Sequence, residues 1–245
     1  MKCLEKELTL RVSECDVHSR WRPGAMLIEM QEAAGEHSGT EGCGRDTLGR
    51  MGLAWVVARM DLQVLRYPGF GERVTVRTFH RPVRHRFFPR YFQILDGEGQ
   101  LIAQASSLWL LMDLETRQSV PADRLPRPLT DNSDMPEIMS MPGGIAALDA
   151  PERVTSRTAV YSDLDINGHV NNTRYMDWLC DALGAGTMAE HPPERVTIHF
   201  DHEIRPEEPI ELHLRQRGAE FELTGVHGDR QAFHMGGRLS GYPEG

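Results

Sequence analysis

The apolar residues follow two spacings along the chain, a helical period and a strict alternation, and these spacings predict the elements. An alternating stretch at 8–12 predicts a half-buried strand, and apolar residues three and four positions apart predict a helix from about 25 to 37. Apolar runs and alternating stretches then predict four strands at 53–65, 74–79, 86–95 and 101–112, separated by turns that contain glycine or proline. The first half of the chain is therefore expected to hold one strand, one helix and four further strands.

The second half predicts the same order of elements. A strand is expected at 154–161, a helix at about 172–183, and strands near 196–204, 210–217, 220–227 and 231–239. The turn at 66–74 compares with the turn at 205–212. The repetition predicts an α+β fold in which an antiparallel sheet wraps around one helix, duplicated in tandem.

The expected domain boundaries follow from the prolines and glycines between the halves. Six prolines and the pair Gly143-Gly144 lie between 117 and 151 and leave little room for regular elements. We therefore expect an N-terminal unit at 1–116, a surface linker at 117–150 and a C-terminal unit at 151–245.

Composition narrows the class of protein. A chain of 245 residues with 40% hydrophobic and 26% charged residues is typical of a globular protein, and its formal net charge of −9 argues against general nucleic-acid binding. No apolar run approaches the length that spans a bilayer, and the N-terminus lacks the features of a signal or transit peptide. The four scattered cysteines predict reduced thiols in a cytoplasmic protein.

The candidate chemistry lies in a polar loop just before the second helix. Asp165, Asn167 and His169 stand at alternate positions, and Gly168 allows the loop to turn sharply. The positive end of the following helix dipole suits a carbonyl oxygen or a developing oxyanion. Asp, Asn, Gly and His in succession also occur in ordinary surface turns, so these residue types alone do not establish a site.

The residues around this loop resemble a known family. The pattern Asp-x-Asn-x-His-Val-Asn-Asn-x-x-Tyr, from Asp165 to Tyr175, resembles the active-site segment of the acyl-acyl carrier protein (acyl-ACP) thioesterases, and the segments 53–60, 66–68 and 105–112 are similar to the first unit of that family. The resemblance spans about 8–239. It implies a tandem hotdog fold, an acyl-chain pocket in the N-terminal unit, the catalytic motif in the C-terminal unit and no cofactor.

The resemblance also implies roles for four residues. An aspartate, an asparagine and a histidine of the motif act with a glutamate from a later strand, which correspond to Asp165, Asn167, His169 and Glu203. We expect Glu203 or Asp165 to deprotonate a water while Asn167 and His169 hold the water or polarise the thioester carbonyl. Backbone N–H groups near residues 170 and 171 would complete an oxyanion site.

Two features of the glutamate segment affect this hypothesis. Plant members have a cysteine directly after the glutamate, whereas this chain has Ile204, so a water mechanism is favoured over a cysteine nucleophile. Strict alternation along a strand also places Glu203 on the face opposite the core, where it would be solvated unless that face meets the cleft between the units or a bulge redirects it. His199 and His202 would point to opposite faces of the same strand, so no metal site is expected.

Other stretches carry weaker predictions. A basic run at 81–90, extended by Arg124 and Arg127, is either a solvated strand and turn or a docking surface for an acidic carrier protein. The acyl chain needs an apolar tunnel, for which Met26, Met30, Trp55 and Trp109 are candidates, although each would also suit an ordinary core. Neither a nucleophile elbow nor a phosphate-binding loop is present.

The function predicted from the sequence is hydrolysis of fatty acyl-ACP to free fatty acid and holo-ACP, in fatty acid biosynthesis. The alternatives are an acyl-CoA thioesterase, a hotdog hydratase of enoyl thioesters, which would not need Glu203, and a non-catalytic acyl-binding protein. The expected partner is an acyl carrier protein with a phosphopantetheine-linked chain, without nucleic-acid or membrane partners. Both a monomer and a homodimer are compatible with two fused units.

Overall fold

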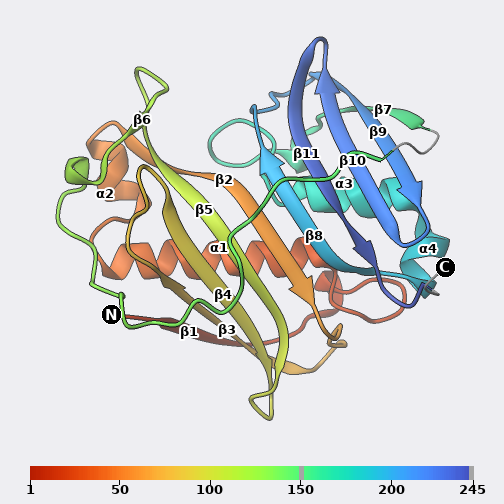
Figure 1. The fold of residues 1–245 in the computed structure, drawn as a ribbon, viewed down its shortest axis with the longest axis horizontal. Coiled ribbons are helices and arrows are strands. Elements are labelled where there is room, and N and C mark those ends of the chain that lie inside the picture. The colour runs from red at the N-terminus through yellow and green to blue at the C-terminus, as the bar shows by residue number, and fades with distance from the viewer. Residues whose placement is uncertain (149–151, 243–245) are drawn as a thin grey trace. The chain divides into compact units, whose positions relative to one another are not determined.

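Two units with the same order of strands and helix make up the chain in the computed structural model (Figure 1), which describes residues 1–148 and 152–242. Unit 1 is Met1–Pro142 and unit 2 is Gly143–Gly245. The segment 117–150, expected as a linker, falls on both sides of this division, because its part up to Pro142 belongs to unit 1.

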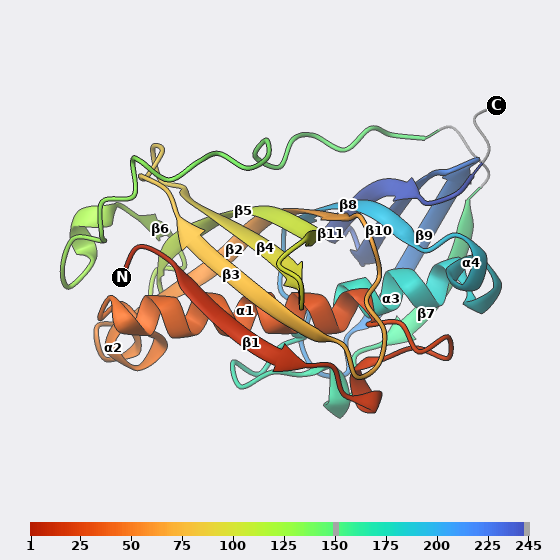
Figure 2. The ribbon, with the colours of Figure 1, turned by 90° about the horizontal axis from the view of Figure 1, so that it is seen from below.

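Unit 1 is a five-stranded antiparallel sheet with one long helix against it (Figures 1 and 2), and the short strand β6 extends the pairing of β5. The order across the sheet is β1-β3-β4-β5-β2. The elements are β1 (Leu4–Thr9), α1 (Pro23–Thr40), α2 (Arg45–Arg50), β2 (Leu53–Val64), β3 (Arg73–His80), β4 (Phe88–Asp96), β5 (Leu101–Asp113) and β6 (Ser119–Val120).

Sequence features fix both ends of α1. Pro23 occupies the first helical turn, where its missing N–H costs nothing and its fixed φ suits the helix. Along the helix, Met26, Met30 and Ala33 are fully buried, as the helical spacing predicts. At the C-terminal end Arg127 donates hydrogen bonds to the carbonyl groups of Thr40 and Glu41, so a cation satisfies the last carbonyls.

Unit 2 repeats this arrangement. Its strand order is β7-β9-β10-β11-β8, which equals that of unit 1 when the strands of each unit are counted along the chain. The elements are β7 (Arg153–Thr158), α3 (Arg174–Leu183), α4 (Ala185–Glu190), β8 (Pro193–Phe200), β9 (Pro209–Arg217), β10 (Glu220–His227) and β11 (Arg230–Leu239). The predicted strand, helix and four strands, occurring twice, are confirmed.

Aromatic rings of α3 and β11 form the centre of the core of unit 2. The Tyr175 and Phe233 rings stack with centroids 4.4 Å apart, and Trp178 packs beside both. Gly225 on β10 makes room for this stack, because a Cβ there would lie 2.1 Å from Cε1 of Phe233. Helix α3, which follows the polar loop, is therefore held in place by closely packed aromatic rings.

The structure corrects two expected strands. The first strand is Leu4–Thr9 rather than 8–12, because its partner β3 begins at Arg73, opposite Thr9, and the ladder cannot continue. Val12 instead lies in a 3₁₀ turn with 74% of its surface exposed. Strand β8 ends at Phe200 rather than at 204. The short helices α2 and α4 were not predicted, since six residues are too few to show a helical period.

None of the helices described by the structure combines the length and the apolar character that a bilayer crossing requires.

Candidate active site

The loop at residues 160–171, here called the motif loop, is closed by its own backbone. Leu164 and Val170 form an isolated antiparallel bridge. Between them, Asp165 N–H donates to His169 C=O at 2.9 Å and Gly168 N–H donates to Asp165 C=O at 3.0 Å. Gly168 has φ +80°, a conformation that glycine adopts without steric cost. Glycine therefore favours the turn that places the imidazole.

Asp165 is bonded within the motif loop through both carboxylate oxygens. Its Oδ1 accepts the Asn167 N–H at 2.7 Å, and its Oδ2 accepts the Asn167 side-chain Nδ2 at 3.0 Å. The first of these bonds is an Asx-turn, in which a side chain takes the place of a backbone acceptor. Asp165 thus supports the loop and orients the exposed Asn167 side chain.

His169 lies between two carboxylates. Its Nδ1 is 3.9 Å from Asp165 Oδ1, and its Nε2 is 4.0 Å from Glu203 Oε2. The side chains of His169, Asp165 and Glu203 are 27%, 14% and 24% exposed, so solvent reaches all three. The structure therefore brings together the four residues expected from the sequence, with Asn167 joined to Asp165.

Glu203 reaches this place from a loop and not from a strand. Asp201 N–H and His202 N–H both donate to Ala232 C=O, at 3.0 and 2.9 Å, so two residues oppose one and the ladder regularity ends. Strict alternation therefore does not extend to Glu203, and the irregularity that was left open from the sequence as a bulge is present before it. His199 on β8 bonds to the carbonyl group of Gly143, and His202, which lies beyond the end of β8, bonds to that of Gln231.

The expected oxyanion donors are already bonded within the protein. Val170 N–H donates to Ile204 C=O at 2.8 Å, and Asn171 N–H donates to Asp163 C=O at 2.9 Å. These bonds tie the motif loop to the Glu203 segment and to the preceding turn. The Asn171 side chain, in turn, accepts the Thr173 N–H at 2.9 Å at the start of α3. The two backbone groups therefore build the site and do not bind substrate.

Two further residues lie beside the site, and neither of them was assigned a role in it from the sequence. Arg205 donates to Glu203 Oε1 from Nη2 at 3.0 Å, and its Nε lies 3.4 Å from the same oxygen. Tyr175 is buried on α3, and this burial is the main cause that raises the pKa of its phenol. The negative charges of Asp165, Glu203 and Glu208 raise that pKa further. The proximity of Arg205 to Glu203 along the chain was the only signal in the sequence for the first of these contacts.

A loop in unit 1, residues 11–22, makes the same hydrogen bonds as the motif loop, and we call it the N-terminal loop copy. Asp16 N–H donates to Arg20 C=O at 2.8 Å, and Ser19 N–H donates to Asp16 C=O at 3.0 Å. His18 N–H donates to Asp16 Oδ1 at 2.8 Å, and Ser19 has φ +60° where the motif loop has its glycine. The sequence shows no second motif here, yet the backbone is the same.

The side chains at the chemical positions differ between the two loops. Trp21 N–H donates to Pro68 C=O at 2.8 Å, the counterpart of the bond that Ile204 accepts in unit 2. Tyr67 therefore takes the place of Glu203. Its ring faces the guanidinium group of Arg20, whose Cζ lies 6.0 Å from the ring centroid. Unit 1 thus has no carboxylate at the position that Glu203 occupies.

Arg20 takes the place of His169. It forms an ion pair with Asp16, in which Nε and Nη2 both donate to Oδ2, at 3.1 and 2.9 Å. An arginine remains protonated at all ordinary pH values, so it cannot exchange a proton with a substrate as an imidazole can. The N-terminal loop copy therefore keeps the architecture of the site without an acid–base group at the His169 position.

The turns that follow β2 and β8 show the register of the repeat. Gly69 N–H donates to the Glu72 side chain at 2.6 Å, and Arg205 N–H donates to the Glu208 side chain at 2.9 Å. The turn in unit 1 therefore aligns with 202–208. The comparison with 205–212 expected from the prolines is out of register.

The basic run at 81–90 is bound to its own chain. Arg81 donates to the carbonyl groups of Asn132 and Ser133 at 3.0 and 2.7 Å, and Arg84 pairs with Glu137. Arg86 donates to Ser119 C=O at 2.6 Å, while Arg90 is buried against His37, Ser38 and Thr78. Arg81, Arg84 and Arg86 thus hold the segment after β5, whereas Arg90 is bonded to α1 and β3. The exposed Arg84 and Arg86 fit the solvated turn expected for this run, and the docking role stays a prediction.

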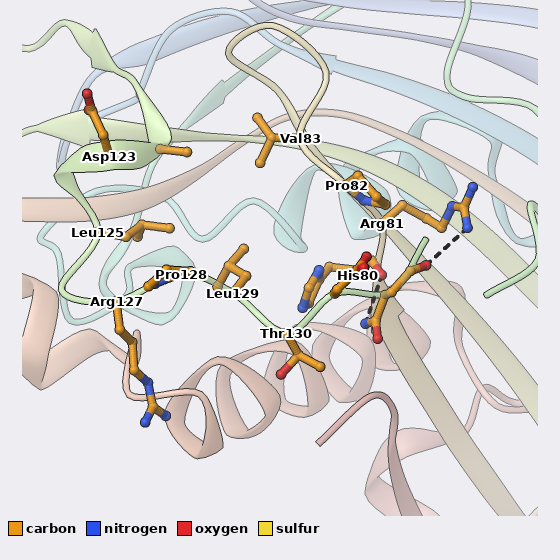
Figure 3. A pocket seen from close by; sticks show the side chains of 13 residues that line it. His80, Arg81, Pro82, Val83, Asp123, Leu125, Arg127, Pro128, Leu129 and Thr130 are labelled. Carbon is orange, nitrogen blue, oxygen red and sulfur yellow. Dashed lines mark hydrogen bonds between the residues drawn. The ribbon is translucent and has the colours of Figure 1, made fainter. Parts of the chain in front are cut away.

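A cavity of about 450 Å³ lies elsewhere in unit 1, between the residues that follow β3 and the segment 122–132 (Figure 3). Its lining mixes apolar side chains such as Val83, Leu125 and Leu129 with His80 and Arg81. None of its lining residues belongs to the motif loop. Across residues 1–148 and 152–242, no three His, Cys, Asp or Glu side chains are grouped as metal ligands would be.

Family models match the two units of the chain separately. Residues 2–124 match the acyl-ACP thioesterase N-terminal domain and residues 149–236 match the acyl-ACP thioesterase C-terminal domain. The chain is 29% identical over 199 residues to the chloroplastic acyl-[acyl-carrier-protein] hydrolase FATB2 of Cuphea viscosissima, covering 76% of this chain and 48% of that protein. It is 26% identical over 228 residues to the chloroplastic palmitoyl-acyl carrier protein thioesterase of Arabidopsis thaliana, covering 86% of this chain and 54% of the relative. The chain thus spans about half the length of these curated relatives.

Solved structures share the fold over nearly the whole chain. An acyl-ACP thioesterase from Bacteroides thetaiotaomicron has a TM-score of 0.82 at 23% identity, with 98% of each chain covered. The 12:0-ACP thioesterase from Umbellularia californica has a TM-score of 0.78 at 19% identity, covering 98% of this chain and 97% of that one. The α+β tandem hotdog fold is confirmed. With both of its halves matched, this chain belongs to the acyl-ACP thioesterase family.

Proposed function

We propose that this protein hydrolyses the thioester of a fatty acyl chain carried by acyl carrier protein, releasing the free fatty acid and the carrier thiol. The proposal combines the family with the geometry of the motif loop. The observation that carries it is the position of His169, whose Nδ1 lies near Asp165 and whose Nε2 lies near Glu203.

The gap between His169 and Glu203 suits a water molecule. At 4.0 Å, Nε2 and Oε2 are too far apart for a direct hydrogen bond. A water with hydrogen bonds of about 2.8 Å can contact two atoms that are up to roughly 5.5 Å apart. One water held by both groups would be the nucleophile, with the carboxylate as its base.

The reaction then proceeds by addition and elimination. The water oxygen bonds to the thioester carbon while Glu203 takes the water proton, and the carbonyl electron pair moves to oxygen. His169 donates a hydrogen bond to that oxygen or to the attacking water. The tetrahedral intermediate collapses, the carbon–sulfur bond breaks, and the proton held by Glu203 passes to the departing thiolate.

We assign the base role to Glu203 rather than to Asp165 because of the N-terminal loop copy. Asp16 makes the same backbone bonds as Asp165 in a loop where Arg20 replaces the imidazole and Tyr67 replaces the glutamate. An aspartate at this position is thus explained by loop architecture alone. Asp165 would position Asn167 and His169 and leave proton transfer to Glu203.

The carrier, the location and the assembly are also part of this proposal. The names of the plant relatives support an acyl carrier protein over coenzyme A as the leaving group. Cys3, Cys15, Cys43 and Cys180 are free thiols, which fits the reducing cytoplasm. A monomer or a homodimer would serve, and no cofactor enters the mechanism.

The acyl-chain pocket is proposed for unit 1, with two candidate places. Met26 and Met30 are fully buried on α1, and a thioether side chain can adapt to an apolar chain. The cavity lined by Val83, Leu125 and Leu129 is the other place. Met30→Ala should extend the preferred chain length if the chain runs along α1, whereas Leu129→Trp should shorten it if the chain fills the cavity.

The central test is thiol release from a panel of acyl-ACP and acyl-CoA substrates. His169→Ala and Glu203→Gln should each lower kcat by about 10²–10⁴, the range typical of lost acid–base groups. Arg20→Ala, at the equivalent position of the N-terminal loop copy, is the matched control and should retain wild-type turnover within about twofold.

Other outcomes would point to other functions. Turnover of acyl-CoA substrates alone would show that coenzyme A, and not acyl carrier protein, is the leaving group. Hydration of enoyl thioesters that survives Glu203→Gln would support the hydratase. Acyl-thioester binding without any reaction would support a non-catalytic protein.

A further inference from the structure

The two oxygens of the Glu203 carboxylate face different partners. Oε1 accepts the hydrogen bond from Arg205 Nη2 at 3.0 Å, while Oε2 lies 4.0 Å from His169 Nε2. A carboxylate fixed at one oxygen by a cation has its second oxygen directed by the planarity of the group. The contact with Arg205 therefore determines which oxygen faces the imidazole.

The peptide group that joins Ile204 to Arg205 is held in place at both its N–H and its carbonyl. Its N–H donates to the Glu208 side chain at 2.9 Å, and the preceding carbonyl, of Ile204, accepts the Val170 N–H at 2.8 Å. Ile204 itself is fully buried. Although the Arg205 side chain is 68% exposed, its starting point is fixed relative to the motif loop.

Unit 1 provides an internal comparison for this contact. Gly69 takes the place of Arg205 in the aligned turn, with the same backbone bond to a glutamate. Tyr67 takes the place of Glu203. Where the Glu203 position carries no carboxylate, the Arg205 position carries no arginine, so the backbone of this turn does not itself require the cation.

We propose that Arg205 is a positioning residue of the hydrolytic site, which keeps Glu203 ionised and directs its Oε2 toward His169. The proposal rests on the proposed function. A guanidinium beside a carboxylate favours the charged form, and only the charged form can take a proton from water.

The other groups around Glu203 act in both directions. His169 faces it from the motif loop, with Asp165 on the far side of the imidazole. Tyr175 of α3 interacts with the Glu203 charge and stays a neutral phenol, because burial raises its pKa. Glu208, which accepts the Arg205 N–H, is a further carboxylate of the same turn. Arg205 contacts Glu203 directly and favours its ionised form.

The first test is kinetic and uses Arg205→Gln and Arg205→Lys. In Arg205→Gln, the acidic limb of the pH profile of kcat/KM should move upward by about 0.5–1 pH unit, a shift kept small by solvent exposure. On the falling part of that limb, where the rate drops tenfold per pH unit, kcat should be about three- to tenfold below wild type at the same pH, with KM unchanged and with the same loss for acyl-ACP and for a small acyl thioester. Arg205→Lys should recover most of the loss.

A matched control is Arg238→Gln. Arg238 pairs with Glu194 at 3.0 Å in the same unit, with 46% and 40% of the side chains exposed, but Glu194 lies at the opposite end of β8 from the Glu203 loop. This control should leave the pH profile unchanged. An unmoved limb in Arg205→Gln would overturn the proposal, and so would a rise in KM confined to acyl-ACP, which would make Arg205 a docking residue.

A second measurement does not depend on turnover. The carboxyl carbon of Glu203, followed by ¹³C NMR through a pH titration and assigned with Glu203→Gln, should titrate about 0.5–1 unit higher in Arg205→Gln than in wild type. This shift would support the contact even if no thioester were hydrolysed, in which case the proposed function alone would fail. Equal titration in both proteins would refute the role of Arg205.

Discussion

Asp16 and Asp165 share three hydrogen bonds at equivalent points of the two units. Each donates its N–H to the carbonyl four residues later, accepts the N–H three residues later at its own carbonyl, and accepts the N–H two residues later at Oδ1. One loop ends in the imidazole of His169 and the other in the guanidinium of Arg20. The chain therefore contains an internal control for its own site.

The two aspartates should respond differently to the same substitution. Asp165→Asn keeps an oxygen acceptor for the loop, so it should lower the free energy of unfolding by less than about 1 kcal/mol, but it should lower kcat at least tenfold by misorienting Asn167 and His169. Asp16→Asn removes a partly exposed ion pair worth at most about 1 kcal/mol and should leave kcat unchanged. Urea unfolding and steady-state kinetics on both variants measure this. Equal kinetic losses would contradict the assignment.

The left-handed positions of the two loops give a second pair. Gly168 has φ +80°, and no atom lies within 4 Å of the place that a Cβ would take, so Gly168→Ala meets only conformational strain and should lower the free energy of unfolding by about 1 kcal/mol. Ser19 already carries this strain at φ +60°, so Ser19→Gly should relieve it and raise the free energy of unfolding by up to about 1 kcal/mol. Urea midpoints test both. A stabilised Gly168→Ala would show that the loop can relax.

Gly225 should tolerate no side chain. A Cβ there would lie 2.1 Å from the Phe233 ring, which is itself stacked on Tyr175, so Gly225→Ala should lower the free energy of unfolding by about 2–3 kcal/mol. Gly186→Ala is the control, because that glycine of α4 has nothing within 4 Å and alanine favours the helix. It should be neutral or stabilising by up to about 1 kcal/mol. Thermal unfolding compares them, and a mild Gly225→Ala would mean that the aromatic stack can shift.

Unit 1 should lose stability in acid through Glu41. Burial alone would raise the pKa of this carboxyl, but hydrogen bonds from His80 and Thr130 and the charge of His80 outweigh it and lower the pKa from 4.5 to about 2. A carboxyl whose pKa is lowered by folding contributes stability above its unfolded pKa and loses it as the pH falls toward the folded value. The contribution should therefore be complete above about pH 5.5 and should disappear between about pH 4.5 and 2.

Glu41→Gln provides the measurement. The difference in the free energy of unfolding between wild type and Glu41→Gln should be about 2 kcal/mol smaller at pH 3 than at pH 7. Urea unfolding of both proteins across this range gives the difference directly, and subtraction removes the other carboxyls common to both. A difference that stays constant with pH would show that Glu41 has an ordinary pKa in the folded protein.

The sequence by itself determined the repeated order of strand, helix and four strands, the helix after the motif loop and the family. These features are local, because the period of apolar residues follows directly from the geometry of a helix or a strand. The longer pattern from Asp165 to Tyr175 was also sufficient to locate the loop. Element ends were less well determined, as β1 shows, since its last residue depends on where its partner β3 begins.

Only the tertiary structure decided how the site is built. Glu203 meets His169 because β8 stops at Phe200, and it stops because two successive N–H groups share the Ala232 carbonyl of another strand. The N–H of Val170 is likewise occupied by the carbonyl of Ile204, which lies far along the chain beyond α3 and β8. The N-terminal loop copy is hidden in the sequence because its backbone bonds need little beyond an aspartate and one residue that accepts a positive φ. Contacts between distant segments leave no periodic signal along a chain, so no pattern of apolar positions could have revealed them.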